Sequence, residues 1–217
     1  MFTGIIREVG RLARVVSQGD SRRLEVACQR TLEGLRFGDS VAVDGVCLTV
    51  AALKPASFEA VVMEETFGRT TLATHRPGAA VNLEPSLRLG QPLDGHLVLG
   101  HVDGMGRLER FEERGASKLV WWSAPTELLP FFAVKGSVAL DGISLTLVEV
   151  DDQAGQCSVS VLNQTLVETS LGDKGIGAAV NLEVDVLARY ALRGLAFAQG
   201  KPPSGVTREL LEHSGFL

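Results

Sequence analysis

Two short stretches of the chain place small polar side chains where they could bind or react with a ligand. Strand alternation sends the apolar residues of 46–50 to one face and leaves Cys47 and Thr49 on the other. The same pattern leaves Ser144 and Thr146 free, 97 residues later. Two such groups about 7 Å apart, beside strand-edge amides, suit the polar edge of a planar heterocycle. If only one such pair occurred, we would interpret it as ordinary solvent-facing residues. Because the same pair recurs at the equivalent position, we favour a binding pocket at each.

Two histidines, His96 and His101, lie close together along the chain. They are separated by an odd number of positions, so an extended chain points them to opposite faces. One metal ion could not bind both, and we therefore expect no metal site. His101, beside a pocket, is a candidate acid or base because an imidazole titrates near neutral pH.

Signature motifs of several large enzyme classes do not occur in the sequence. There is no GxGxxG or GxxxxGK[ST] phosphate loop, no HExxH zinc motif and no GxSxG nucleophile elbow. Nucleotide-dependent and hydrolase chemistry of those types is not indicated.

Composition narrows the class of protein further. Of 217 residues, 45% are hydrophobic and 22% are charged, which is typical of a folded globular chain. The net charge of −5 argues against a nucleic-acid partner. Three scattered cysteines, together with no signal-peptide pattern and no apolar run of membrane-spanning length, predict a cytoplasmic protein without a membrane partner.

Internal repeats divide the chain. The block GAAVNLE occurs twice, 99 residues apart, and two other blocks are echoed in the same order at offsets of 96 and 97. The paired blocks are 78–84 with 177–183, 40–49 with 137–146, and 3–12 with 99–108. We predict two homologous domains, 1–97 and 98–187, followed by a C-terminal segment, 188–217.

Each repeat is expected to be all-β. Asp44-Gly45 and Asp141-Gly142 interrupt apolar alternation and predict tight hairpins. Further strands are expected at 23–28, 58–63, 80–83, 118–123, 157–162 and 179–184, with short helices at 31–35 and 126–129. About six short strands per repeat predict a small closed antiparallel barrel.

One longer helix is predicted over 186–198, with Asp185 as its N-cap. It is apolar almost all round, with a polar stripe formed by Arg189 and Arg193. Such a helix must be buried on most sides, either on its own barrels or against the same helix of other subunits. We favour the second interpretation. A short helical pattern follows at 207–213.

These motifs together resemble the riboflavin synthase family, the α-chain type of lumazine-binding repeat proteins. The resemblance is carried by 1–5, 38–49, 100–104, 135–146 and 180–190. It implies two six-stranded Greek-key barrels in tandem, a homotrimer held by the C-terminal helix, and no metal or organic cofactor. It leaves open whether a lumazine synthase shell encloses the trimer.

The reaction implied by the resemblance is a dismutation of 6,7-dimethyl-8-ribityllumazine. One molecule donates a four-carbon unit to a second, which yields riboflavin and 5-amino-6-ribitylaminopyrimidinedione. Two identical substrates need two similar pockets, which gives the duplication a chemical reason. The active site would lie between the N-terminal barrel of one subunit and the C-terminal barrel of the next. The alternative is a non-catalytic, antenna-type protein that binds lumazine or flavin.

Site residues are implied for both pockets. The catalytic candidates are Phe2, packed on the rings, with Cys47, His101, Ser144 and Asp185. The first pocket would use Gly4, Ile5, Ile6, Ser40, Cys47, Leu48, Thr49 and the strand Val61, Val62, Met63, Glu64, Glu65, Thr66. The second would use Gly100, His101, Val102, Lys135, Ser144, Leu145, Thr146 and the strand Ser160, Val161, Leu162, Asn163, Gln164, Thr165. Asn163-Gln164 and Phe67-Gly68-Arg69 depart from the family pattern and bear on contacts to the ribityl chain.

Overall fold

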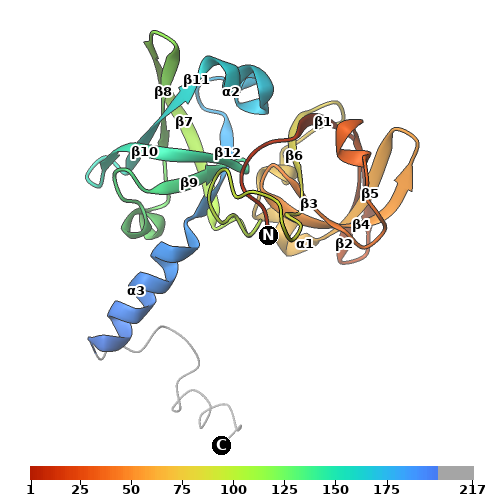
Figure 1. Cartoon of the computed structure of the whole chain (residues 1–217), viewed down its shortest axis with the longest axis horizontal. Helices are drawn as coiled ribbons and strands as arrows, with labels where there is room; N and C mark the ends of the chain where they lie inside the picture. Colours follow the sequence, from red (N-terminus) through yellow and green to blue (C-terminus); the bar gives the residue numbers. More distant parts are fainter. Residues whose placement is uncertain (200–217) are drawn as a thin grey trace, which may run out of the picture.

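Two closed antiparallel barrels and a projecting helix make up the computed structural model, which describes residues 1–199 (Figure 1). The first barrel consists of β1 (Glu8–Gln18), β2 (Ser21–Ala27), β3 (Ser40–Val43), β4 (Val46–Lys54), β5 (Ser57–Met63) and β6 (Ala80–Pro85), in the order β1-β2-β5-β4-β3-β6. The second consists of β7 (Gly104–Arg114), β8 (Ser117–Ser123), β9 (Ser137–Leu140), β10 (Ile143–Asp151), β11 (Gln156–Leu162) and β12 (Ala179–Val184), in the equivalent order. The predicted tandem-barrel fold is confirmed.

The helical segments differ from the sequence prediction. The elements expected at 31–35 and 126–129 are the 3₁₀ helices η1 (Arg30–Leu32) and η3 (Thr126–Phe131). The pocket strands expected over 61–66 and 160–165 were wrong at their ends, because β5 ends at Met63 and β11 at Leu162. Helices α1 (Glu64–Gly68) and α2 (Asn163–Glu168) follow, then η2 (Thr71–Ala73) and η4 (Ser170–Asp173). Phe67 in α1 and Leu171 in η4 are buried against the cores of their barrels.

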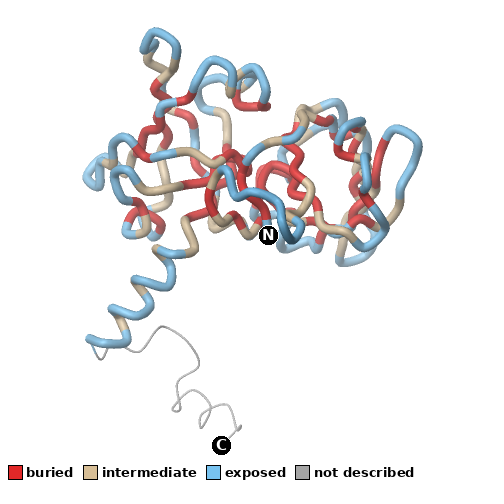
Figure 2. Tube along the Cα trace, in the orientation of Figure 1, coloured by how far each residue is buried: buried red, intermediate tan, exposed pale blue. Residues whose placement is uncertain are grey.

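Each barrel has its own apolar core (Figure 2). The inward residues Val46, Leu48 and Val50 of β4 are at most 3% exposed, as alternation predicts. The hairpin turns also have the predicted geometry, with positive φ at both Asp44 (46°) and Gly45 (77°).

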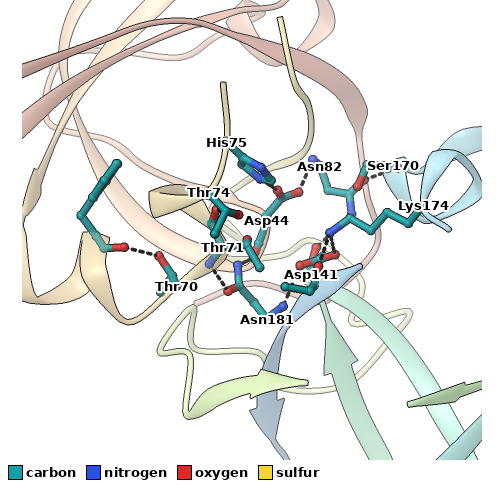
Figure 3. A network of polar contacts seen from close by, with 12 residues as sticks. Asp44, Thr70, Thr71, Thr74, His75, Asn82, Asp141, Ser170, Lys174 and Asn181 are labelled. Atoms are coloured by element: carbon teal, nitrogen blue, oxygen red, sulfur yellow. Dashed lines mark hydrogen bonds and ion pairs between the residues drawn. The ribbon is translucent and has the colours of Figure 1, made fainter. Parts of the chain in front are cut away.

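A polar network joins the barrels at these turns (Figure 3). Asn82 of β6 donates through Nδ2 to the carbonyl of Asp141 (3.0 Å) and accepts from the backbone N–H of Ser170 (2.7 Å). Its counterpart Asn181 makes the reciprocal pair, each 2.8 Å, with backbone groups of the first barrel. The asparagine of the repeated block therefore links one barrel to the other.

Two buried carboxylates complete this network. Asp44 Oδ2 lies 2.7 Å from His75 Nε2, and Asp141 Oδ2 accepts from Lys174 Nζ at 2.5 Å. Burial raises the pKa of Asp141 to about 6 despite the adjacent ammonium group. The duplication has thus kept the two carboxylates but given them different basic partners.

The C-terminal helix α3 (Val186–Ala198) extends away from the barrels (Figure 1). Asp185 caps it as predicted, with Oδ1 accepting from the Leu187 N–H at 2.9 Å. None of its residues is buried, and four of its large apolar side chains are 57–76% exposed, namely Leu187, Tyr190, Leu195 and Phe197. Packing on its own barrels, the first interpretation above, is therefore contradicted.

The helical pattern expected at 207–213 lies outside the described residues. Within residues 1–199, no helix combines the length and the apolar composition needed to cross a membrane.

Candidate active site

The first polar face lies on the outside of the N-terminal barrel. Ser40, Thr49 and Val61 are cross-strand neighbours on β3, β4 and β5. Thr49 and Val61 are exposed, while Cys47, opposite Ala42 on β3, is half-buried. The predicted separation of this face from the core is confirmed.

The second face repeats this layout. Ser144 and Thr146 of β10 lie opposite Ala139 and Ser137 of β9, and Thr146 is exposed. Lys135, also exposed, sits in the turn before β9 with φ at +68°. Both barrels therefore present a small polar pair on an open outer surface.

Each face is bordered by a segment from the other repeat. Ser144 N donates to Gly4 O, and Cys47 N donates to Gly100 O, both at 2.8 Å. Both glycines have positive φ, +77° and +79°, and a Cβ on either would lie 2.6 Å from the Cβ of its partner. Only glycine allows so close an approach in this conformation.

These two contacts between the repeats correct the expected grouping of residues into pockets. The resemblance grouped 4–6 with Cys47 and 100–102 with Ser144, but the structure pairs them the other way. Ile6 packs against the core of the second barrel, and Val102 packs against that of the first. Adjacency along a repeat did not predict it, because the segments cross between the barrels.

Two buried glutamates hold the crossing segments. Glu84 accepts from the N–H groups of Thr3 (2.7 Å) and Gly4 (2.9 Å). Glu183 accepts in the same way from Gly100 (2.9 Å) and His101 (3.1 Å). Burial raises the pKa of both carboxyl groups, and these N–H donors partly offset the shift. The sequence interpretation missed both residues, although each closes the repeated block GAAVNLE.

Phe2 occupies a different position from the one expected. Its side chain is fully buried in a cluster with Ala42, Val98 and Ala139, and Cys47 packs against this cluster. The ring is not free to pack on a ligand in this structure, so that expectation is corrected. Phe2 instead supports the strand that carries Cys47.

The two histidines separate: His96 is buried, and His101 is exposed. His96 Nδ1 lies 2.7 Å from Ser144 Oγ, a contact the sequence interpretation missed because it weighed His96 only as a metal ligand. Within residues 1–199 no group of three or more potential metal-binding side chains occurs.

Asp185 lies where β12 passes into α3, so its carboxylate is used as the helix cap. Nearby, Asp103 accepts from Val184 N at 2.9 Å and forms an ion pair with Arg189 of α3. These contacts fix the start of the helix relative to the second barrel.

The remaining predicted residues of the pocket strands alternate. Val62 and Val161 lie in the barrel cores at 2% and 1% exposure, so the expectation that their side chains line the pockets is wrong. Met63 and Leu162 are each 59% exposed at the ends of β5 and β11. Glu64 is paired with Arg22 at 2.7 Å, and Gln164 with Glu168 at 2.9 Å. A hollow of about 450 Å³ is lined by Ile5, Ile6 and Ser40 with the 85–94 connection, and one of about 720 Å³ includes Asn163. A single chain thus leaves both faces open.

Comparison with known proteins identifies the family. The Lumazine binding domain model matches twice, over residues 3–86 and 99–185. Riboflavin synthase of Actinobacillus pleuropneumoniae is 38% identical over the whole of both chains, and that of Brucella abortus is 41% identical over 89% of this chain and 97% of the relative. The chain belongs to the riboflavin synthase family.

Solved structures show the same fold. LumP complexed with riboflavin superposes with a TM-score of 0.78 over 85% of this chain and 99% of LumP, at 22% identity. LumP complexed with 6,7-dimethyl-8-(1'-D-ribityl) lumazine gives 0.76 over the same shares. This likeness concerns the tandem barrels, whereas membership of the riboflavin synthase family, a family of enzymes, rests on the sequence relatives.

Proposed function

We propose that the protein is a riboflavin synthase. Two molecules of 6,7-dimethyl-8-ribityllumazine would be converted to riboflavin and 5-amino-6-ribitylaminopyrimidinedione by transfer of a four-carbon unit. The observation that carries this proposal is the pair of equivalent faces, Cys47 with Thr49 and Ser144 with Thr146. Each face offers a threonine hydroxyl for one pyrimidinedione edge.

Residues of both repeats would form each binding site. The first would combine Cys47, Leu48 and Thr49 with 100–102 and the outer residues of 61–66. The second would combine Ser144, Leu145 and Thr146 with 4–6, Lys135 and the outer residues of 160–165. The observed exchange of the crossing segments supports this assignment.

The catalytic contribution would be mainly positional. Holding two planar rings together removes the entropic barrier of a bimolecular encounter. The reaction also needs a proton taken from the 7-methyl group of one lumazine and a nucleophile added to the other. Cys47, Ser144 and His101 are the side chains proposed to lie near those atoms, with Asp185 close to the second face.

Assembly would complete the site. Both faces are open in the single chain, and α3 exposes Leu187, Tyr190 and Phe197. We infer a homotrimer in which these helices pack together and bring the first face of one subunit against the second face of the next. A cytoplasmic location fits the three free cysteines. Lumazine synthase is a further candidate partner, and co-sedimentation of the two proteins tests this association.

One assay tests the proposal. Purified protein is mixed with 6,7-dimethyl-8-ribityllumazine, and riboflavin absorbance is followed with no cofactor added. Formation of one riboflavin for every two lumazines supports the enzyme. Binding of one lumazine per chain without turnover would indicate the antenna-type alternative, and neither binding nor turnover would leave a ligand-free scaffold.

Two matched variants make the assay specific to the faces. Thr49→Val and Thr146→Val remove one hydroxyl from each face and keep the side-chain shape. We expect weaker lumazine binding in both. Ser17→Ala, on the exposed end of β1, is the control and should bind as the wild type does.

A further inference from the structure

A buried imidazole lies directly behind the second polar face. His96 is 9% exposed, and its Nδ1 lies 2.7 Å from Ser144 Oγ. Ser144 comes from the outward side of β10 and is half-buried. Its hydroxyl therefore points to the outer side of the barrel and contacts the imidazole there.

The backbone fixes this contact on both sides. His96 N donates to Thr3 O at 3.1 Å, and Ser144 N donates to Gly4 O at 2.8 Å. Gly95 is packed so closely that a Cβ there would lie 2.9 Å from Ser144 Oγ. The serine and the histidine are thus held together by main-chain contacts that do not depend on a ligand.

The other imidazole nitrogen has no partner. His96 Nε2 is buried without a hydrogen bond to any of residues 1–199. An unpaired buried polar atom costs about 1–3 kcal/mol, and such atoms in native proteins call for a specific explanation. A ring that is closed off at Nε2 can exchange protons with the outer face only through Nδ1 and the serine hydroxyl.

The surroundings keep the ring able to accept a proton. Burial lowers the pKa of His96, and the charge of Asp185 partly offsets this shift. The neighbouring carboxylate Glu84 is occupied by the N–H groups of Thr3 and Gly4. The imidazole is therefore neutral at neutral pH, and an imidazolium formed there would be stabilised by Asp185.

Among residues 1–199, the first face shows no equivalent contact. Cys47 N donates to the Gly100 carbonyl and the Cys47 side chain packs against the Phe2 cluster, and no imidazole bonds to its thiol within these residues. His96 belongs to the connection between the repeated blocks 3–12 and 99–108. The two faces would bind the same substrate, yet in the described part of the chain only the hydroxyl of the second face, on Ser144, contacts an imidazole. This difference between the faces can make one bound lumazine the donor and the other the acceptor of the four-carbon unit.

We propose that Ser144 and His96 form a proton relay that deprotonates the lumazine bound at the second face, an inference that rests on the proposed function. The methyl C–H bond breaks, and its electron pair stays in the conjugated ring system. The methyl proton passes to Ser144 Oγ while the hydroxyl proton passes to His96 Nδ1. The relay then holds one extra proton, on His96. The cycle closes when this proton passes back through Ser144 Oγ to the departing product. His96 acts through Ser144 and is a positioning residue.

The test is exchange of the methyl protons of lumazine in D₂O, followed by proton NMR, alongside riboflavin formation. His96→Asn keeps a side-chain amide near the Nδ1 position but cannot accept the proton. We expect about 100-fold slower exchange and a kcat lower by at least that factor, with KM within threefold. The low-pH limb of the kcat profile should also disappear. Glu149→Gln, exposed on the same strand, is the control.

Several outcomes would overturn the relay. Riboflavin formation by His96→Asn within threefold of wild type would do so while leaving the proposed function intact. If wild type forms no riboflavin, the proposed function fails, and the exchange measurement still decides the relay. Should His96→Asn not fold, ¹⁵N NMR of the His96 ring is compared in wild type and Ser144→Ala. An unchanged Nδ1 resonance would refute the contact on which the relay depends.

Discussion

At the scale of single residues, the most informative feature is how unequal the two copies have become. Cys47 and Ser144 occupy equivalent strand positions, but Cys47 adjoins the Phe2 cluster and Ser144 adjoins His96. The two residues have equivalent backbone contacts, but the side chains next to them differ.

His96 should make stability depend on pH in a defined direction. Burial lowers its pKa in the folded state, whereas the unfolded value is about 6.5. The unfolded chain therefore binds the proton more readily, and the free energy of unfolding should fall as the pH drops below about 6.5. Urea unfolding of wild type and His96→Asn at several pH values measures this contribution. Parallel curves for the two proteins would contradict the prediction.

Gly4 and Gly100 should not tolerate a side chain. Alanine at either position combines positive φ with a clash against the strand of the other barrel, so we expect a loss of about 1–3 kcal/mol or more in unfolding free energy. Gly19→Ala is the matched control, since Gly19 has φ of +58° but nothing within 4 Å. Equal losses at all three positions would show that close approach to Ser144 and Cys47 contributes nothing.

At the scale of elements, β6 and β12 do more than close their barrels. Each carries an asparagine that bonds to the other barrel and a glutamate that holds a crossing segment. The block GAAVNLE is thus repeated because both barrels need the same two connections.

Loss of one asparagine should weaken the joint between barrels. Asn82→Ala leaves the Ser170 N–H and the Asp141 carbonyl without that partner, at about 1–3 kcal/mol for each group. Urea unfolding should show a loss of about 2–6 kcal/mol. Asn163→Ala, at the exposed start of α2, should change stability by less than about 0.5 kcal/mol. A loss at Asn82 no larger than that would show that the network does not stabilise the joint.

At the scale of the whole molecule, the chain presents two incomplete faces and an uncovered apolar helix. Exposed apolar side chains gathered on one element indicate an interface with another protein surface. In the proposed homotrimer, the two other copies would cover α3 and close both faces.

Removing α3 should therefore separate the subunits. A chain ending before Val186, or the variant Tyr190→Glu with Phe197→Glu, is expected to sediment as a monomer with little riboflavin-forming activity. Arg193→Ser, on the polar stripe of the same helix, should stay assembled. A truncated monomer with full turnover would disprove an active site shared between subunits.

Repetition and alternation determined much of this protein from the sequence. The two DG hairpins, the inward face of β4 and the apolar helix with its Asp185 cap depend on local backbone preference and periodicity, so single residues and their spacing predict them. The helices α1 and α2 were not predicted, because they follow directly on β5 and β11 and the strand pattern was extended into them.

Only the tertiary structure decided how the repeats share their sites. The contact of Gly4 with Ser144, the contact of Gly100 with Cys47, and the place of His96 behind Ser144 all join residues far apart in the chain. Such contacts depend on the relative placement of two closed barrels, which buried hydrogen bonds fix and no local pattern encodes. Strand alternation could show which side chains face outward, but not which segment lies against them.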